Sequence, residues 1–248
     1  MIDKVNSTLS LPLDDDWTAS DVSYQSFPMP GGVSHGVWNP GLWVNDEKEN
    51  DANPDVYLWG GSYFRVNEPG HPRDRNLWTL QTQSDGNGNW DKASVPQTIK
   101  QTAAGTSVTC GGRGYMIGGW GSNDTEPSFG SVKNGMINVP GLVSYDFASG
   151  DWNNHSIEAL TQEKSGTYAD GAAVCVELEG QSPKLFVLGG AVNAEPAGSY
   201  STPSLLDIPF WDPDTEKWYK QETSSALPGP RKEHCAVGVP GPNNTYDM

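Results

Sequence analysis

The stretch KLFVLGG at Lys184–Gly190 decides the fold, because variants of it recur along the chain. It is a short apolar run that ends in two glycines, and its counterparts are DVYLWGG at Asp55–Gly61 and GYMIGG at Gly114–Gly119. Short runs of β-branched, aromatic and leucine residues are typical of strands that are buried on both faces. Glycine at the end of such a strand indicates a positive φ or a close approach of another backbone. We therefore predict structural glycines, not phosphate cradles, at Gly60-Gly61, Gly118-Gly119 and Gly189-Gly190.

Three tryptophans mark the other end of each unit. Trp90, Trp152 and Trp218 each follow a polar turn, 28 to 33 residues after the second glycine of a doublet. After each tryptophan, a strand of small residues opens the next unit, at 105–110, 171–176 and 234–239. This order indicates four short strands per unit, and no stretch has the apolar period of a long helix. A single four-stranded sheet cannot cover its own faces, so we predict that the units stack with the tryptophan rings between them.

An aromatic–aspartate pair precedes the tryptophan in two of the units. The pairs are Tyr145-Asp146 and Trp211-Asp212, whereas the first unit has Gln81 or a neighbour where an aspartate is expected. Gly-Gly, an aromatic–Asp pair and then Trp, repeated every 50 to 70 residues or so, resembles the kelch repeat, whose blades form a β-propeller. LPGPRKEHCAVGV at Leu227–Val239 is similar to the Pro-Arg-x-x-His opening of a kelch blade. The resemblance covers residues 6–248 and implies an all-β, kelch-type β-propeller.

The resemblance implies that residues 1–248 form one propeller segment, which it also divides into blades. We predict a partial blade at 1–31, full blades at 32–100, 101–166 and 167–228, and the start of another blade at 229–248. Residues 7–13 and 16–24 are expected to be the third and fourth strands of the partial blade, and 245–248 the start of a second strand. These four-stranded antiparallel sheets amount to about four blades, whereas kelch propellers usually have about six or seven. We predict an interior piece of such a ring, with closure as a four-bladed ring as the alternative.

The composition excludes several classes of partner. Lys and Arg number 15 against 31 Asp and Glu, and the net charge of −16 disfavours nucleic-acid and anionic membrane-surface partners. No apolar run approaches the roughly 18 residues of a membrane-spanning helix, and no signal peptide is seen, although an incomplete start would hide one. Three cysteines, Cys110, Cys175 and Cys235, cannot all pair within one chain, and their spacing resembles no zinc site. They leave the redox compartment undecided.

The long loops after the glycine doublets are the predicted binding surface. In a propeller, the connections between second and third strands are displayed together on one rim, and here they span 62–75, 120–138 and 191–204. Aromatic and arginine side chains are enriched in binding cores. The candidate binding residues are Tyr63, Arg65, Arg73, Trp120, Phe129, Tyr200 and Arg231. The alternative is that these aromatics only fix long loops in place.

The sequence shows no catalytic or metal-binding constellation, so we predict no catalytic residue, no metal and no cofactor. The four histidines are scattered, no Gly-x-Ser-x-Gly occurs, and Asp14-Asp15-Asp16 fits a solvated turn better than a calcium site. A copper-radical oxidase of the galactose-oxidase type would need two tyrosines, two histidines and a cysteine on one face, a set that we cannot assemble here. Candidate glycosylation sites, which give weak support for secretion, are Asn6, Asn123, Asn154 and Asn243.

The sequence favours a non-enzymatic propeller that acts as an interaction scaffold. STLSLPLDDDWTAS (7–20), VPGLVSYDFASGDWNNHS (139–156) and FWDPDTEKWYKQET (210–223) look like ascomycete kelch proteins that carry a secretion signal and often a membrane span. This likeness implies a fungal cell-surface or secreted parent protein. The predicted partner is a protein or a cell-wall polysaccharide bound by the rim loops, besides the remaining blades of the same propeller. Alternatives are half of a carbohydrate-active enzyme (an oxidase or a sugar epimerase), which only fold precedent supports, and an intracellular polarity or adaptor protein.

Overall fold

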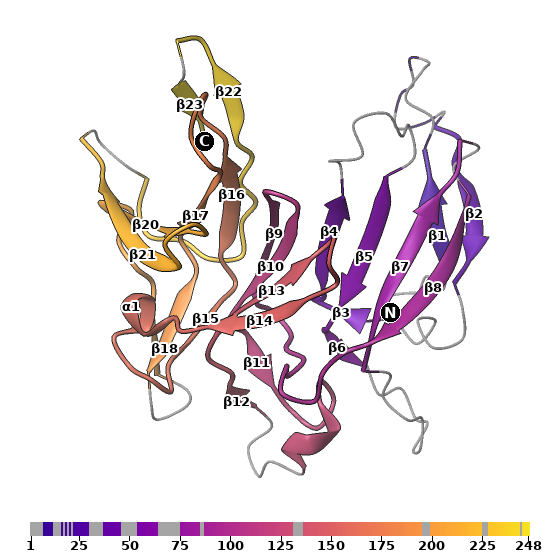
Figure 1. The fold of residues 1–248 in the computed structure, drawn as a ribbon, viewed down its shortest axis with the longest axis horizontal. Coiled ribbons are helices and arrows are strands. Elements are labelled where there is room, and N and C mark those ends of the chain that lie inside the picture. Colours follow the sequence, from indigo (N-terminus) through magenta and orange to yellow (C-terminus); the bar gives the residue numbers. More distant parts are fainter. Residues whose placement is uncertain are drawn as a thin grey trace.

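The predicted all-β fold is confirmed by a computed structural model, in which three four-stranded antiparallel sheets stand side by side (Figure 1). We call these sheets blades I, II and III in chain order. Their first strands lie next to one another at the centre of the molecule. The structure describes residues 7–11, 16, 18, 20, 22–29, 37–45, 54–63, 75–84, 87–130, 136–194, 199–224, 228–243 and 245–248.

Each blade is a meander whose neighbouring strands follow one another in the chain. Blade I consists of β4 Gly41–Asn45, β5 Asp55–Trp59, β7 Asn76–Thr82 and β8 Gly88–Ser94. Blade II consists of β9 Thr106–Cys110, β10 Arg113–Ile117, β13 Leu142–Asp146 and β14 Trp152–His155. Blade III consists of β16 Ala172–Val176, β17 Lys184–Leu188, β20 Asp207–Asp212 and β21 Lys217–Glu222. Contacts join β4 to β9 and β9 to β16, so the first strands line a common axis.

Short strand pairs extend the blades beyond these sheets. One end carries β3 Val37–Trp38 with β6 Ser62–Tyr63, β11 Trp120–Gly121 with β12 Ile137–Asn138, and β15 Thr167–Ala169 with β18 Ala191–Ala194 and β19 Ser199–Ser201. Two further hairpins are β1 Ser7–Ser10 with β2 Gln25–Pro28, and β22 Val239–Gly241 with β23 Thr245–Asp247. The described helices are one α-helical turn, α1 Glu158–Thr161, and one 3-10 turn, Pro127–Phe129. The long loops predicted after the glycine doublets therefore contain short strands of their own.

The strand predicted over 16–24 is wrong. Residues Ser7–Ser10 pair with Gln25–Pro28, which lie beyond that range. The reason is a turn, in which Val22 N donates to Thr18 O at 3.0 Å, so the chain reverses before the second strand begins.

The strand predicted over 234–239 is also wrong, because β22 begins only at Val239. The residues before it pack against blade III instead of pairing with a strand. A Cβ placed on Gly238 would lie 2.7 Å from the Tyr246 ring and 3.4 Å from Val174 Cβ. The glycine thus allows a close approach to the Tyr246 ring.

The junction between blades I and II is an aromatic cluster. Trp43 is fully buried, and its ring centroid lies 5.9 Å from that of Trp59 and 6.5 Å from that of Tyr145. Trp152 closes the cluster, with ring centroids 5.3 Å from Trp59 and 4.8 Å from Tyr145. Gly114 makes room for the cluster, because a Cβ at that position would collide with the Trp43 indole.

The junction between blades II and III combines packing with a covalent link. The ring centroids of Trp211 and Trp218 lie 5.4 Å apart, within a cluster whose other side chains are largely aliphatic. Trp218 Nε1 also donates a hydrogen bond to the Ser156 carbonyl of the segment after β14, at 3.0 Å. Cys110 of β9 and Cys175 of β16 form a disulfide with a Cα–Cα distance of 5.1 Å. The disulfide joins the first strands of two neighbouring blades, and it settles a pairing that the sequence left open.

The aspartates of the aromatic–Asp pairs each close a hairpin and bind a basic residue on the neighbouring strand. Asp146 Oδ1 accepts a hydrogen bond from Ser149 N at 2.9 Å, and its Oδ2 lies 3.0 Å from Arg113 Nε. Asp212 Oδ1 lies 2.8 Å from Lys184 Nζ in the matching place of blade III. The position that corresponds to Arg113 and Lys184 in blade I is Asp55, which faces Gln81 in the sheet register.

A belt of backbone hydrogen bonds crosses the blades. Ala104 N donates to Asn39 O at 3.2 Å, and Ala104 O accepts from Asp170 N at 2.9 Å. Asp170 O in turn accepts from Glu233 N at 2.8 Å. All four residues have a positive φ between 49° and 58°, which is uncommon outside glycine. They lie 63 to 66 residues apart, so the belt repeats once per blade.

The glycine doublets bind the segment that opens the next blade. Gly119 N donates to Tyr168 O at 2.9 Å, and the equivalent bonds join Gly61 to Thr102 at 2.7 Å and Gly190 to Arg231 at 2.8 Å. The glycine before it is also required, because Gly118 has a φ of 59° and a Cβ there would strike the Tyr168 backbone. Each doublet therefore docks one blade onto the next.

Candidate functional site

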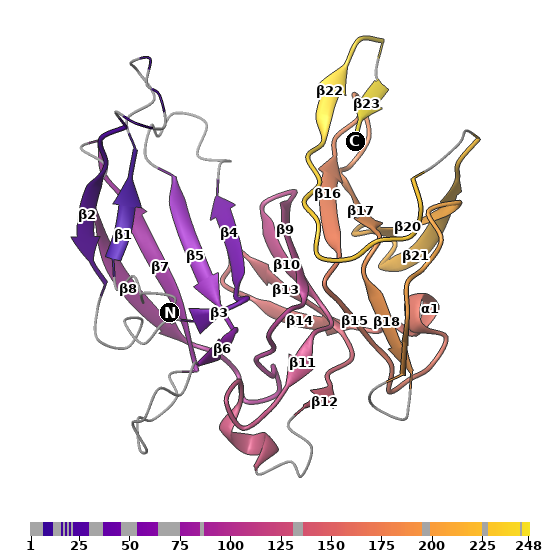
Figure 2. The ribbon, with the colours of Figure 1, turned by 180° about the vertical axis from the view of Figure 1, so that it is seen from behind.

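One end of the blades gathers the short strand pairs and the long loops, at the bottom of Figures 1 and 2. We call this end the rim. Its described parts are residues 37–40, 60–63, 95–104, 118–130, 136–141, 157–171, 189–194 and 199–206. All three blades contribute to it, so its shape depends on the contacts that tie the loops of one blade to those of the next.

A buried ion pair ties the rim of blade II to blade I. The Glu126 carboxylate is 1% exposed, and its Oε2 lies 2.8 Å from Arg75 Nε. Arg75 Nη2 also donates to the Ile99 carbonyl at 2.9 Å, and Lys100 Nζ lies 3.0 Å from Ser128 Oγ. Removing one partner of such a pair leaves an uncompensated buried charge. The loop that follows β11 is therefore held firmly against the segment that joins blades I and II.

Side-chain amides tie the rim of blade II to that of blade III. Asn193 Nδ2 donates to Asn138 Oδ1 at 3.0 Å, and Asn138 Nδ2 donates to the Asn193 carbonyl at 3.3 Å. The buried Thr167 hydroxyl lies 2.9 Å from the Gly119 carbonyl and 3.0 Å from the Val139 carbonyl. These contacts make the described rim one continuous surface.

The structure places the predicted binding residues at separate points of this rim. Trp120 is half-buried in β11, and Phe129 is half-buried over Gly121 in the same blade. Tyr200 is 59% exposed at the edge of blade III. Tyr63 belongs to β6, but its side chain lies outside the described part of the chain, as do Arg65 and Arg73.

Tyr200 contacts a lysine that is paired with two carboxylates. Lys232 Nζ lies 5.0 Å from the centroid of the Tyr200 ring, 3.0 Å from Glu233 Oε1 and 4.0 Å from Asp170 Oδ2. Burial raises the pKa of Asp170, and the nearby ammonium only partly opposes this effect. The Arg231 side chain is exposed, and its backbone carbonyl accepts the hydrogen bond from Gly190 N that joins the glycine doublet to the next segment. The sequence predicts Arg231 as a binding residue, whereas the cation that contacts the Tyr200 ring is Lys232.

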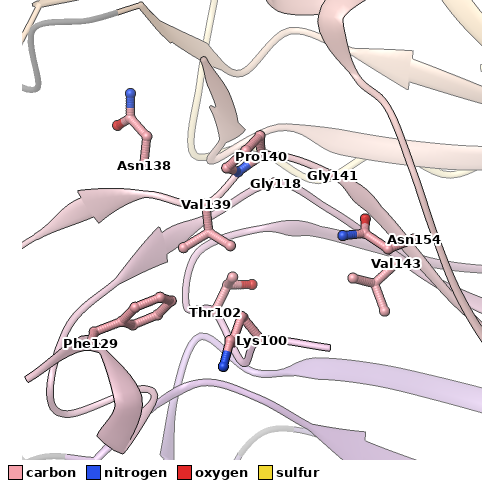
Figure 3. Close-up of a pocket in the computed structure, with 10 residues that line it drawn as sticks. All are labelled: Lys100, Thr102, Gly118, Phe129, Asn138, Val139, Pro140, Gly141, Val143 and Asn154. Atoms are coloured by element: carbon pink, nitrogen blue, oxygen red, sulfur yellow. The ribbon is translucent and has the colours of Figure 1, made fainter. Parts of the chain in front are cut away.

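A pocket of about 200 Å³ opens at the rim end of blade II (Figure 3). It lies between the segment that joins blades I and II and the start of β13. Its lining residues are Lys100, Thr102, Gly118, Phe129, Asn138, Val139, Pro140, Gly141, Val143 and Asn154. Of these, only Phe129 was predicted as a binding residue. The others come from four separate chain segments, 100–102, 118, 138–143 and 154, which meet because the blades stack.

The polar groups of this pocket can donate and accept hydrogen bonds. Thr102 is 2% exposed, and its hydroxyl has no hydrogen-bond partner among the described residues. In Figure 3 the Asn154 amide projects from β14 toward the same space. A hydroxyl, an amide and the Lys100 ammonium above apolar walls suit a neutral, hydroxyl-rich ligand.

The described residues contain no group of three or more His, Cys, Asp or Glu side chains that could hold a metal ion. His234, in the segment that precedes the β22–β23 hairpin, lies against Gly189. Asp14 and Asp15 lie outside the part of the chain that the structure describes. A search of the described helices finds none that is long and apolar enough to cross a membrane.

The predicted glycosylation sites differ in their surroundings. Asn243 lies in the tight turn between β22 and β23 with a φ of 58°, and Asn123 lies in a rim turn in which the Thr125 hydroxyl donates to Ser122 O. Asn154 lies on the outermost strand of blade II. Asn6 falls outside the described residues.

Comparison with known proteins supports the repeat. A scan of protein-family profiles found no match. The chain is 25% identical over 262 residues to a kelch repeat-containing protein of the ascomycete Arthroderma benhamiae. This similarity over most of the chain supports the kelch-type repeat that the sequence predicts. The alignment covers 93% of this chain and 37% of the relative, so the chain spans little more than a third of that protein.

Proposed function

We propose that this kelch chain is part of a non-enzymatic interaction scaffold of a fungal cell-surface or secreted protein. Its rim would bind a protein or a cell-wall polysaccharide. The observation that carries this proposal is the continuity of the rim, in which the Arg75–Glu126 pair and the Asn138–Asn193 pair fix loops of neighbouring blades to each other. Loops that are fixed in advance lose little conformational entropy on binding.

The disulfide supports the extracellular part of the proposal. Cys110 and Cys175 pair across two blades, and structural disulfides persist mainly in oxidising compartments. The net charge of −16 agrees with a partner that is not a nucleic acid.

Binding to polysaccharide and protein baits tests the rim. The rim variant carries alanine at Arg65, Arg73, Trp120 and Tyr200. The control variant carries alanine at Lys217, Lys220, Tyr24 and Tyr219, and so removes two cations and two aromatic rings elsewhere. Each protein is incubated with insoluble β-glucan, chitin and mannan, and with extracellular proteins of a fungal host.

We expect the rim variant to lose at least tenfold in affinity for whichever bait the unchanged protein binds, since aromatic and arginine residues dominate binding energies. The control variant should bind normally. Equal binding by both variants would contradict the rim assignment, provided that both melt at the temperature of the unchanged protein.

A further inference from the structure

The pocket of blade II has an unsatisfied polar wall. Thr102 Oγ1 is buried and has no hydrogen-bond partner in the part of the chain that the structure describes. Apolar side chains of the same pocket are those of Val139, Pro140 and Phe129. A buried hydroxyl without a partner costs free energy, which a ligand with hydroxyl groups of its own would recover.

The edge of this pocket carries an asparagine in a glycosylation sequence. Asn154-His155-Ser156 fits the pattern Asn-x-Ser/Thr, and the Asn154 side chain is exposed. In Figure 3 its amide nitrogen is directed toward the space between Val139 and Thr102. Among the sequon asparagines that the structure describes, which are Asn123, Asn154 and Asn243, only Asn154 lines the pocket.

We propose that Asn154 carries an N-linked glycan and that the first sugar of this glycan, an N-acetylhexosamine, occupies the adjoining pocket. The inference rests on the secreted location in the proposed function, because protein N-glycosylation of this type requires passage through the secretory pathway. The apolar face of the sugar ring lies against Val139 and Pro140. Its hydroxyl groups exchange hydrogen bonds with Thr102 Oγ1 and accept one from Lys100 Nζ.

Covalent attachment explains how a shallow pocket can hold one sugar. A free monosaccharide would lose its translational and rotational freedom on binding, and few contacts are available here to offset that cost. A sugar attached to Asn154 is already at the pocket, so its effective concentration is high. Modest contacts then suffice.

The attachment step is an ordinary group transfer. Asn154 Nδ2 forms a bond to the anomeric carbon of the first sugar of a lipid diphosphate-linked oligosaccharide. The bond between that carbon and the diphosphate oxygen breaks, and the lipid diphosphate leaves with the electron pair. The proton lost from Nδ2 goes to a base of the host glycosyltransferase. No oxidant or reductant is needed.

The first experiment measures occupancy. The full chain is secreted from a yeast host, and its peptides are mapped by mass spectrometry. We expect glycan on Asn154. Glycan on Asn123 or Asn243 with none on Asn154 would overturn this inference and leave the secreted location standing. No glycan on any sequon, together with free Cys110 and Cys175 thiols, would overturn the secreted location itself.

The second experiment measures whether the first sugar contacts the pocket. One sample is trimmed by an endoglycosidase that leaves a single sugar on Asn154, and the other is the Asn154→Gln protein. We expect nuclear Overhauser effects from the sugar to the Val139 methyl groups, and an unfolding equilibrium constant about three- to tenfold smaller in the trimmed sample. Asn243→Gln is the matched control and should change neither readout. An occupied Asn154 without either effect would overturn the pocket assignment.

A double-mutant cycle that combines Thr102→Val with loss of the sugar measures the contribution of the Thr102 hydroxyl to the stabilisation by the sugar. Valine keeps the volume of threonine, so any packing effect of the substitution appears equally in the trimmed protein and in the Asn154→Gln protein. We expect the stabilisation by the sugar to fall by about threefold or more in the Thr102→Val background, because one hydrogen bond is lost. An unchanged stabilisation would contradict the role given to Thr102.

A free-sugar titration distinguishes an attached sugar from one that belongs to a partner. N-Acetylglucosamine is added to the Asn154→Gln protein and followed by the Val139 methyl signals. We expect no saturable shift at millimolar sugar. Saturable binding that Thr102→Val abolishes, with Asn154 unoccupied in the secreted protein, would overturn the attached glycan as the occupant.

Discussion

The two blade junctions hold their sheets together in different ways. Blades I and II meet through stacked aromatic rings centred on Trp43, and blade I contains no cysteine. Blades II and III meet through a more aliphatic cluster, to which the disulfide between Cys110 and Cys175 is added. Ring packing acts on the folded state, whereas a disulfide restricts the unfolded chain. The first junction should therefore be sensitive to truncation of side chains, and the second also to reduction.

The largest expected effect is at the aromatic junction. Trp43→Ala should lower the free energy of unfolding by about 4–5 kcal/mol, because the ring is fully buried and lies against the rings of Trp59 and Tyr145. Urea titration followed by circular dichroism measures the loss. Trp43→Phe should cost clearly less. A loss below about 2 kcal/mol for alanine would show that the ring cluster does not hold the blades together.

Removing the disulfide should have the next largest effect. Cys110→Ser combined with Cys175→Ser opens a loop closed over 65 residues, and the chain-entropy relation gives a loss of about 4 kcal/mol. Denaturant titration of the oxidised and the doubly substituted proteins tests this value. Cys235→Ser is the control and should leave the titration unchanged, since that thiol is exposed and free.

The tryptophan at the second junction should matter more than one outside the repeat. Trp218→Ala should cost about 3 kcal/mol, because the ring packs on Trp211 and its Nε1 donates to a carbonyl of blade II. Trp38→Ala should cost under about 1 kcal/mol, since Trp38 is 47% exposed. Equal losses in the same denaturant titration would contradict the assigned repeat register.

The smallest effect concerns pH. The pKa of Asp146 is lowered mainly by the hydrogen bond from Ser149 N, and also by Arg113. A carboxyl with a folded pKa below its unfolded value stabilises the fold at neutral pH, and this contribution disappears as pH falls through the lowered folded pKa. Asp146→Asn should therefore flatten the acid loss of stability by under about 1 kcal/mol. Asp151→Asn in the same hairpin is the control for the loss of one carboxylate charge.

Features that one short segment determines could be read from the sequence. The glycine doublets end strands at left-handed backbone positions, and Trp152 and Trp218 follow polar turns. Glycine at left-handed positions and tryptophan after a polar turn are both visible in the local sequence, so the order of the strands could be predicted correctly. The strand predicted over 16–24 was wrong because a local turn, in which Val22 N donates to Thr18 O, delays the second strand to Gln25–Pro28.

Features that depend on neighbouring blades were harder to read. Within blade I the aspartate lies on the second strand instead of the third: Asp55 stands where blade II has Arg113, and Gln81 stands where blade II has Asp146. The disulfide was missed although a signal existed, since both cysteines lie in strands that open a unit, 65 residues apart. Recognising it required knowing that these first strands are adjacent.

The pocket shows the same limit. Lys100, Asn138 and Asn154 come from three chain segments that have no common motif. They meet because the linker between blades I and II crosses the start of β13. Only the stacking of the sheets, which the sequence implies without its geometry, brings them together.

The belt through Asn39, Ala104, Asp170 and Glu233 has a consequence for how such chains evolve. Each link joins a main-chain amide to a main-chain carbonyl, and the side chains at the four positions have no chemistry in common. A gene duplication that adds one blade, or a deletion that removes one, thus leaves every remaining link intact. The number of blades can change between descendants of one ancestor without any compensating substitution in the belt.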